Sequence, residues 1–170
     1  MVLSVREFSS WLVLFGLLGA ACEQGRVTGG PAFLSTDFTA EQTQSVVTAL
    51  DEWRRATAHA VDFTPVLRNE RDGEHVSVRP GRLGENEAGR EWRGQIMIDV
   101  ELLDRRGSGE LGVTTVTMHE LGHAIGIRAH TSEGLMQSDV SLAHPCIDAY
   151  TLELVCNWMA CGPEAAPTCP

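Results

Sequence analysis

The stretch that decides the fold is HELGHAIGIRAH, which runs from His119 to His130. On a helix, His119 and His123 lie four residues apart and project from the same face, so both imidazole rings can reach one metal ion. Zinc prefers such nitrogen donors, and a catalytic zinc site has three protein ligands and one position left for water. The pattern therefore predicts a metal-binding helix over residues 110–125 that needs a third ligand.

Gly126 and His130 indicate where that third ligand comes from. Glycine readily adopts the left-handed conformation that ends a helix, so the chain can fold back toward the metal after Gly126. His130 lies four residues later, on the returning segment, and is the expected third ligand. Glu120 follows the first histidine, so it lies close enough to accept a proton from a metal-bound water but is directed away from the first coordination shell. Its expected role is that of general base.

This segment resembles the metzincin metalloproteases, and within them the matrixins, whose pattern HExxHxxGxxH is followed by a methionine in a turn below the zinc. The match consists of His119, Glu120, His123, Gly126 and Met136. The resemblance implies an α+β zincin fold, with a small twisted mixed sheet, a zinc-binding active-site helix, a Met-turn supported by Met136 and a C-terminal helix. It also implies one catalytic Zn²⁺ and a zinc metalloendopeptidase that hydrolyses protein or peptide substrates outside the cytoplasm.

One position departs from the family pattern. The family's third histidine falls three residues after the glycine, at the position of Ala129, whereas the histidine here is His130. Because this ligand lies on a loop rather than on a helix, we expect the loop to absorb the extra residue. The alternative third ligand is a downstream glutamate, Glu153, and the glycine turn followed by His130 argues against it.

Two further helices are expected. Thr39 and Gln42 have the spacing of a capping box, and apolar residues then recur at helical spacing over residues 40–58. The C-terminal helix is expected over residues 147–158. The residues expected to line one side of it are Ile147, Tyr150, Leu154 and Trp158.

Three segments have strand character. They cover residues 61–67, 75–78 and 95–100, and in the last of them Ile96, Ile98 and Val100 fall on one face. The polar, glycine-rich stretch over residues 79–94 predicts loops and a short edge strand.

The N-terminal segment predicts export. An apolar run is followed by small residues and Cys22, which resembles a bacterial lipoprotein signal, so residues 1–21 are expected to be a signal peptide and Cys22 a lipidation site. Residues 22–31 are polar and glycine-rich and predict a flexible tether, which leaves residues 32–170 for the matrixin-like catalytic domain. Ordinary secretion is the alternative to a membrane-anchored lipoprotein of the cell envelope.

The remaining cysteines predict a disulfide-braced C-terminus. They are Cys146, Cys156, Cys161 and Cys169. Four cysteines in an exported domain indicate two disulfides, with three pairings that the sequence leaves open. A second metal site is the alternative, but no pair has the two-residue spacing of a zinc knuckle.

Charge limits the partners. The chain has 13 basic and 23 acidic residues and a formal net charge of −10, so nucleic acid is not an expected partner, and a membrane is expected only through the lipid anchor. Resemblance to the matrixins also allows a calcium ion (Ca²⁺) at Asp99, Glu101 and Asp104, with a solvated acidic surface as the competing interpretation.

Two functions of different classes therefore remain. One is a zinc endopeptidase, and the other is a non-catalytic zinc-binding surface lipoprotein that acts as a binding module. Glu120 favours the enzyme, because a purely structural zinc site is normally closed by a fourth protein ligand and has no use for this carboxylate.

Overall fold

The computed structural model describes residues 28–69, 74–138 and 145–169. These residues form an α+β fold with a five-stranded mixed sheet and four helices, which agrees with the predicted fold class. The strands are β1 (Gly29–Leu34), β2 (Asp62–Leu67), β3 (Val76–Pro80), β4 (Gly89–Trp92) and β5 (Gln95–Ile98). The helices are α1 (Ala40–Ala56), α2 (Val100–Arg105), α3 (Gly109–Ala124) and α4 (Ala149–Cys156).

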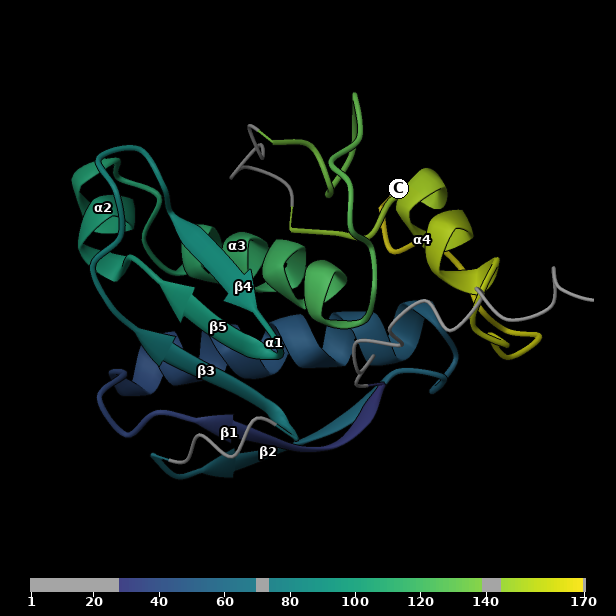
Figure 1. Ribbon diagram of the computed structural model, residues 1–170, viewed down its shortest axis with the longest axis horizontal. Coiled ribbons are helices and arrows are strands. Elements are labelled where there is room, and N and C mark those ends of the chain that lie inside the picture. Colours follow the sequence, from purple (N-terminus) through teal and green to yellow (C-terminus); the bar gives the residue numbers. More distant parts are fainter. Residues whose placement is uncertain (1–27, 70–73, 139–144, 170) are drawn as a thin grey trace, which may run out of the picture.

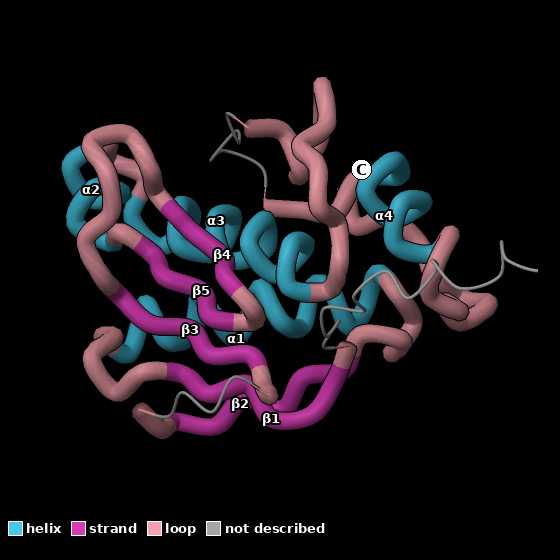
Figure 2. Tube along the Cα trace, in the orientation of Figure 1, coloured by secondary structure: helices cyan, strands magenta, loops and turns pink. Residues whose placement is uncertain are grey.

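The sheet has the strand order β2-β1-β3-β5-β4. The first four strands in this order pair in parallel, and β4 is an antiparallel edge strand that pairs only with β5. Figures 1 and 2 show α1 and α3 side by side on one face of this sheet, with α4 beyond its end. The predicted edge strand within residues 79–94 is β4, and it forms a hairpin with β5.

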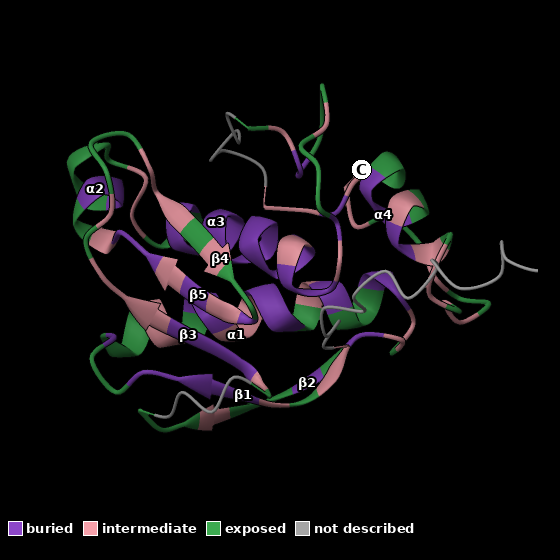
Figure 3. Cartoon of the chain, in the orientation of Figure 1, coloured by how far each residue is buried: buried purple, intermediate pink, exposed green. Residues whose placement is uncertain are grey.

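The core lies between the sheet and the two long helices. Residues of β3 and β5 alternate, so that Val76, Val78, Ile96 and Ile98 are all buried toward the helices. Figure 3 shows that α3 is buried along most of its length. A helix of this kind cannot be recognised by one apolar stripe, because it is covered on nearly all sides.

Trp53 connects the two long helices. Its side chain is fully buried, and its indole Nε1–H donates a hydrogen bond of 2.9 Å to the backbone carbonyl of Met118 on α3. The predicted capping box at the start of α1 is confirmed, since Thr39 accepts from the Gln42 N–H while the Gln42 side chain accepts from the Thr39 N–H. Helix α1 is thus fixed at its first turn and again where it meets α3.

Two predicted boundaries were wrong. Residues 29–31, predicted as part of a tether, belong to β1, and there β1 pairs with β2 alone, so Pro31 is tolerated. The strand predicted over residues 95–100 ends at Ile98, because Asp99 caps α2 by accepting a hydrogen bond of 2.8 Å from the Leu102 N–H. Val100 is therefore the first residue of a helix that was not predicted.

The C-terminal helix was predicted in the right place but with the wrong buried side. Tyr150 is 48% exposed, and the buried residues of α4 are Thr151, Leu152 and Val155. The helix is shorter than predicted and covers only Ala149–Cys156. Ile147 and Trp158 lie outside it, so the four apolar residues do not line one face of a continuous helix.

Two disulfides brace this end of the chain, as predicted. They join Cys146 to Cys169 and Cys156 to Cys161, which settles the pairing that the sequence left open. Disulfides fit a protein exported to an oxidising compartment. Within the described ranges, no helix has the length and apolar character that a membrane crossing requires.

Replacing Trp53 tests the junction between α1 and α3. We expect Trp53→Phe to lower the free energy of unfolding by about 1–3 kcal/mol, because it removes a buried hydrogen bond and leaves space in the core. Urea unfolding measures this, with Trp92→Phe as the control, since Trp92 is 61% exposed and should change stability by about 0.5 kcal/mol or less. Equal losses of unfolding free energy in the two variants would contradict the role of Trp53 in joining α1 to α3.

Candidate metal centre

Three histidine side chains converge after α3. His119 and His123 lie on the last turns of α3, and His130 lies on the loop that follows. The Nε2 atoms are separated by 3.2 Å (His119 to His123), 3.3 Å (His119 to His130) and 3.3 Å (His123 to His130). His119 is buried, His123 is half-buried and His130 is exposed, so the group opens to solvent on one side. All three predicted ligands are brought together.

Two backbone carbonyls orient the rings on the helix. The Nδ1 atom of His119 lies 2.7 Å from the Leu135 carbonyl oxygen, and that of His123 lies 2.6 Å from the Ile127 carbonyl oxygen. A carbonyl oxygen only accepts, so Nδ1 carries the proton in both rings and each Nε2 presents a lone pair. Burial also lowers the pKa of His119 to about 4, which keeps this ring neutral at pH 7. Neutral imidazole with a free Nε2 is the form that binds metal.

The triangle of nitrogens fits one cation. Three nitrogens bound at roughly 2.0–2.1 Å to a tetrahedral ion would be about 3.3–3.4 Å apart, and the observed separations are 3.2–3.3 Å. Without a cation or an added proton, adjacent lone pairs at this separation would repel one another. These residues therefore form a candidate metal site with three protein ligands.

The turn after α3 is built by Gly126. This residue has φ +118°, and the N–H groups of Gly126 and Ile127 donate to the carbonyls of His123 and Gly122 respectively, which is the hydrogen-bond pattern of a Schellman motif. The turn places the Ile127 carbonyl against the His123 ring and sends the chain back toward the helix. The extra residue before His130 is absorbed by the loop, as predicted.

Met136 lies beneath the metal-binding helix. Its side chain is fully buried, and a Cβ placed at Gly122 would come within 2.4 Å of its sulfur and 3.4 Å of the Trp53 ring. Residues 134–137 form the expected tight turn, with Gly134 at φ +78° and the Gln137 N–H donating to the Gly134 carbonyl. Gly122 is therefore the position at which α3, Met136 and Trp53 can pack closely.

Glu120 lies on the other side of the same helix turn, under the edge strand. A Cβ at Gly89 of β4 would be 2.7 Å from the Glu120 carboxylate oxygen, so the strand crosses directly over this side chain. Burial raises the pKa of Glu120 to about 7, and the nearby carboxylates of Glu91 and Glu87 add to the effect. The group can therefore both take and release a proton near neutral pH.

Two of the three histidines line one pocket together with Glu120. This pocket has a volume of about 690 Å³, and its wall is formed by residues 84–89 from the start of β4 and the loop before it. Among its lining residues are His119, Glu120 and His130. His119, His130 and Glu120 therefore face the same space, on the side of the sheet edge.

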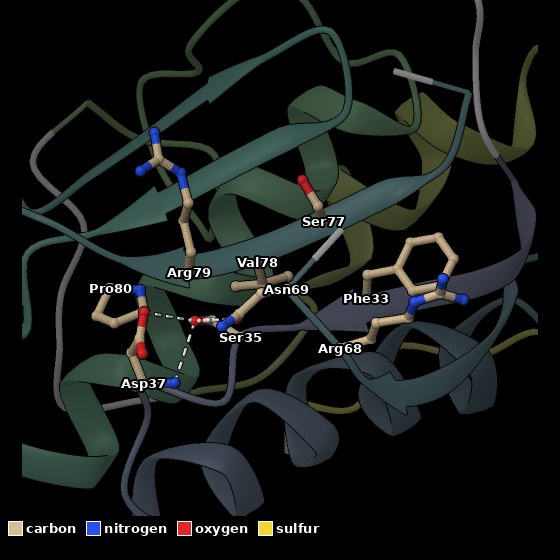
Figure 4. Close-up of a pocket in the computed structure, with 9 residues that line it drawn as sticks. All are labelled: Phe33, Ser35, Asp37, Arg68, Asn69, Ser77, Val78, Arg79 and Pro80. Carbon is tan, nitrogen blue, oxygen red and sulfur yellow. Dashed lines mark hydrogen bonds between the residues drawn. The ribbon is translucent and has the colours of Figure 1, made fainter. Parts of the chain in front are cut away.

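A second pocket, of about 420 Å³, lies on the outer face of the sheet and is shown in Figure 4. Its polar floor is made by Ser35, Asp37 and Asn69, which hydrogen-bond among themselves. The side chains of Arg68 and Arg79 point in different directions in this view. The pocket therefore gathers no set of groups aimed at one point.

The calcium site allowed by the resemblance is not assembled. Asp99 uses its two oxygens to accept from the backbone N–H groups of Leu102 and Leu83, and Glu101 pairs with Arg82. Across the described parts of the chain, the three histidines are the only group of three or more potential metal ligands. Glu153, the alternative third ligand, is exposed on α4 and does not belong to that group. Cys22 lies outside the described residues.

Sequence reasoning missed the residues that support the ligands. Leu135 and Ile127 act through backbone carbonyls, which no side-chain pattern reveals. Gly122 and Gly89 gave a weak signal, because an isolated glycine inside a helix or strand often marks a close approach.

Comparisons with known proteins gave no assignment: no protein-family model matches the chain, and no curated protein matches it either.

The loop register gives a test of the third ligand. We expect His130→Ala to weaken metal binding by more than about 100-fold, because replacing a residue that only supports a metal ligand already lowers metal affinity by about 10–100-fold. Adding Ala129→His to this variant restores the family spacing but should not restore affinity, because consecutive loop residues point in different directions. Competition with a chromophoric chelator measures both. Ala129→His alone is the control, and full recovery in the double variant would refute the observed register.

Close packing at Gly122 gives a second test. Gly122→Ala should lower the free energy of unfolding by about 1–3 kcal/mol through overpacking against Met136 and Trp53, although alanine itself favours a helix by about 1 kcal/mol. In the double variant Gly122→Ala/Met136→Ala, the loss should be smaller than the sum of the two single losses, because the clash is gone. Urea unfolding of all four proteins measures this, and strict additivity would show that the two side chains do not compete for space.

Proposed function

We propose that the chain is a zinc-dependent endopeptidase of the metzincin type, resembling the matrixins. The observation that carries the proposal is the convergence of three histidine Nε2 atoms at 3.2–3.3 Å, with two of these histidines, His119 and His130, lining the same pocket as Glu120. The motif and the turn that holds Met136 support the same assignment.

Zinc is the metal that this donor set suits best. Three neutral imidazoles with no fourth protein ligand are typical of catalytic zinc sites, whereas calcium and magnesium prefer oxygen donors. The carbonyls of Leu135 and Ile127 provide the outer hydrogen bonds that metal-binding histidines usually make. When bound, zinc supplies a Lewis acid that acidifies water and polarises a peptide carbonyl.

Glu120 performs the proton transfers. Its carboxylate accepts a proton from the attacking water as the oxygen bonds to the peptide carbon, and it returns that proton to the amide nitrogen as the C–N bond breaks. A pKa of about 7 suits a group that must do both. The backbone hydrogen bond from Glu91 holds the carboxyl group in place and partly opposes the effect of burial.

The edge of β4 is the place for an extended peptide. Among the described strands, β4 pairs only with β5, and its first residue, Gly89, lines the pocket that contains His119 and Glu120. A substrate strand added to such an edge gains main-chain hydrogen bonds, and pockets for its side chains set specificity. Glycine at position 89 lets the strand pass close above Glu120.

An extracytoplasmic location agrees with the two disulfides. In this proposal the substrates are proteins or peptides outside the cytoplasm, and the protein is either anchored through a lipid on Cys22 or secreted. The competing function is that of a non-catalytic zinc-binding surface lipoprotein. It has no role for a buried carboxyl group that faces the same pocket as the metal ligands.

Replacement of Glu120 tests the proposal. We expect Glu120→Gln to retain the metal and lower the rate of peptide hydrolysis by about 100- to 10,000-fold, because the amide keeps the shape of the side chain but cannot take a proton. Hydrolysis of an unfolded protein substrate is measured at matched zinc content. Glu85→Gln is the control, since Glu85 is an exposed carboxylate on the same pocket wall.

Full activity of the Glu120→Gln protein would rule out its role as the base. A folded, zinc-loaded wild type that cleaves no protein substrate would instead favour the binding module.

A further inference from the structure

Asp148 contacts two parts of the fold at once. One carboxylate oxygen accepts from the Thr151 N–H at 2.9 Å, which caps α4. The other accepts from the Leu135 N–H at 2.7 Å and from the Thr151 hydroxyl at 2.7 Å. Capping a helix needs only the first of these contacts, so the bond to Leu135 calls for a separate explanation.

Leu135 connects Asp148 to the metal site. Its N–H is held by Asp148, and its carbonyl accepts from Nδ1 of His119 at 2.7 Å. The same bond fixes which nitrogen of His119 presents a lone pair to the ion. The path from Asp148 to the metal-binding nitrogen thus contains two hydrogen bonds, and the residue between them is itself buried.

The turn is shaped around this carboxylate. Gly134 has φ +78°, and a Cβ at that position would be 2.3 Å from the Asp148 carboxylate oxygen. Burial alone would raise the pKa of Asp148, but the hydrogen bonds from Leu135 and Thr151 outweigh it and hold the pKa below its usual value. The carboxylate is therefore ionised at neutral pH, and charge-assisted bonds of this kind are stronger than neutral ones.

The C-terminal segment holds Asp148 in position. The Ile147 N–H donates to the Thr168 hydroxyl at 2.8 Å, and the Ile147 carbonyl accepts from the Thr168 N–H at 2.8 Å. The Cys146–Cys169 disulfide closes the same junction. The residue before Asp148 is thus fixed on both sides by the end of the chain.

We propose that Asp148 is a positioning residue for the metal ligand His119, acting through Leu135, and that the Cys146–Cys169 disulfide keeps it in place. The inference rests on the metal site of the proposed function. It assigns the C-terminal segment a part in metal binding, beyond bracing the fold.

The test compares metal affinity with stability in the full chain. Asp148→Ser keeps a good helix cap but is too short to reach Leu135 as well. Asp148→Asn keeps the shape and places an N–H₂ group against one of the two backbone N–H donors. Thr39→Ala is the control for a general loss of stability, because it removes the side-chain cap of α1. Affinity for Zn²⁺ is measured by chelator competition, the visible spectrum of bound Co²⁺ reports ligand geometry, and urea unfolding reports stability.

We expect Asp148→Ser to weaken Zn²⁺ binding by about 10-fold, at the low end of the effect of supporting residues, and to change the Co²⁺ spectrum. Asp148→Asn should weaken Zn²⁺ binding and change the Co²⁺ spectrum to a lesser degree. If the serine variant does not fold, the asparagine variant provides the test. The double variant Cys146→Ser/Cys169→Ser should also weaken binding, whereas Cys156→Ser/Cys161→Ser and Thr39→Ala should leave affinity and spectrum unchanged.

Wild-type affinity and spectrum in the Asp148 variants would overturn the proposal. An equal loss of Zn²⁺ affinity in the two disulfide variants, or the same loss in Thr39→Ala, would also overturn it. Such a result would mean that metal affinity falls only because the fold is less stable. A wild type that binds no metal would refute the site and the inference together. A wild type that binds metal but cleaves nothing would refute the enzyme and leave the inference standing.

Discussion

The convergence of three histidine Nε2 atoms is the constraint on which the site depends. These Nε2 atoms lie 3.2–3.3 Å apart, a separation that suits a shared cation. The imidazole rings of His119 and His123 must keep their orientation for this. Hydrogen bonds from their Nδ1 atoms to the carbonyls of Leu135 and Ile127 hold the rings in place. Both carbonyls come from chain beyond α3. Helix α3 is therefore insufficient by itself, and the segment after it determines whether its histidines converge.

The platform beneath the site depends on close packing of α1, α3 and the turn at residues 134–137. Trp53 bonds to the Met118 carbonyl, and Met136 packs against the same helix at Gly122. A side chain at Gly122 would collide with the Met136 sulfur, which lies 2.4 Å from the position of the added Cβ. On the opposite side, Gly89 lets the edge strand approach Glu120 closely. Two glycines thus set how near the helix can lie to its neighbours, and this closeness accounts for the burial that raises the pKa of Glu120.

Much of the site could be predicted from sequence, because metal ligands must be specific residue types at spacings set by helix geometry. His119, His123, Gly126 and His130 all lie where the pattern placed them. The sheet was predicted less completely. Strand β1 contains two glycines and a proline and is held by pairing with β2 and β3 rather than by its own preferences. The buried side of α4 was misjudged because its neighbours are a turn and a disulfide-linked tail, and their positions depend on contacts distant in sequence.

The loop before His130 can accommodate a spacing one residue longer than in the metzincin pattern that the sequence resembles. The loop that carries His130 is fixed at its start by the hydrogen bonds around Gly126 and at its end by the Thr131 N–H, which donates to the Met136 carbonyl at 2.9 Å. Between these points Arg128 and Ala129 are exposed, so an added residue displaces only solvent. The same insertion within α3 would rotate one histidine by about 100° about the helix axis and separate the pair. Strict spacing is therefore required on the helix, where two ligands share a rigid element, and not on the loop.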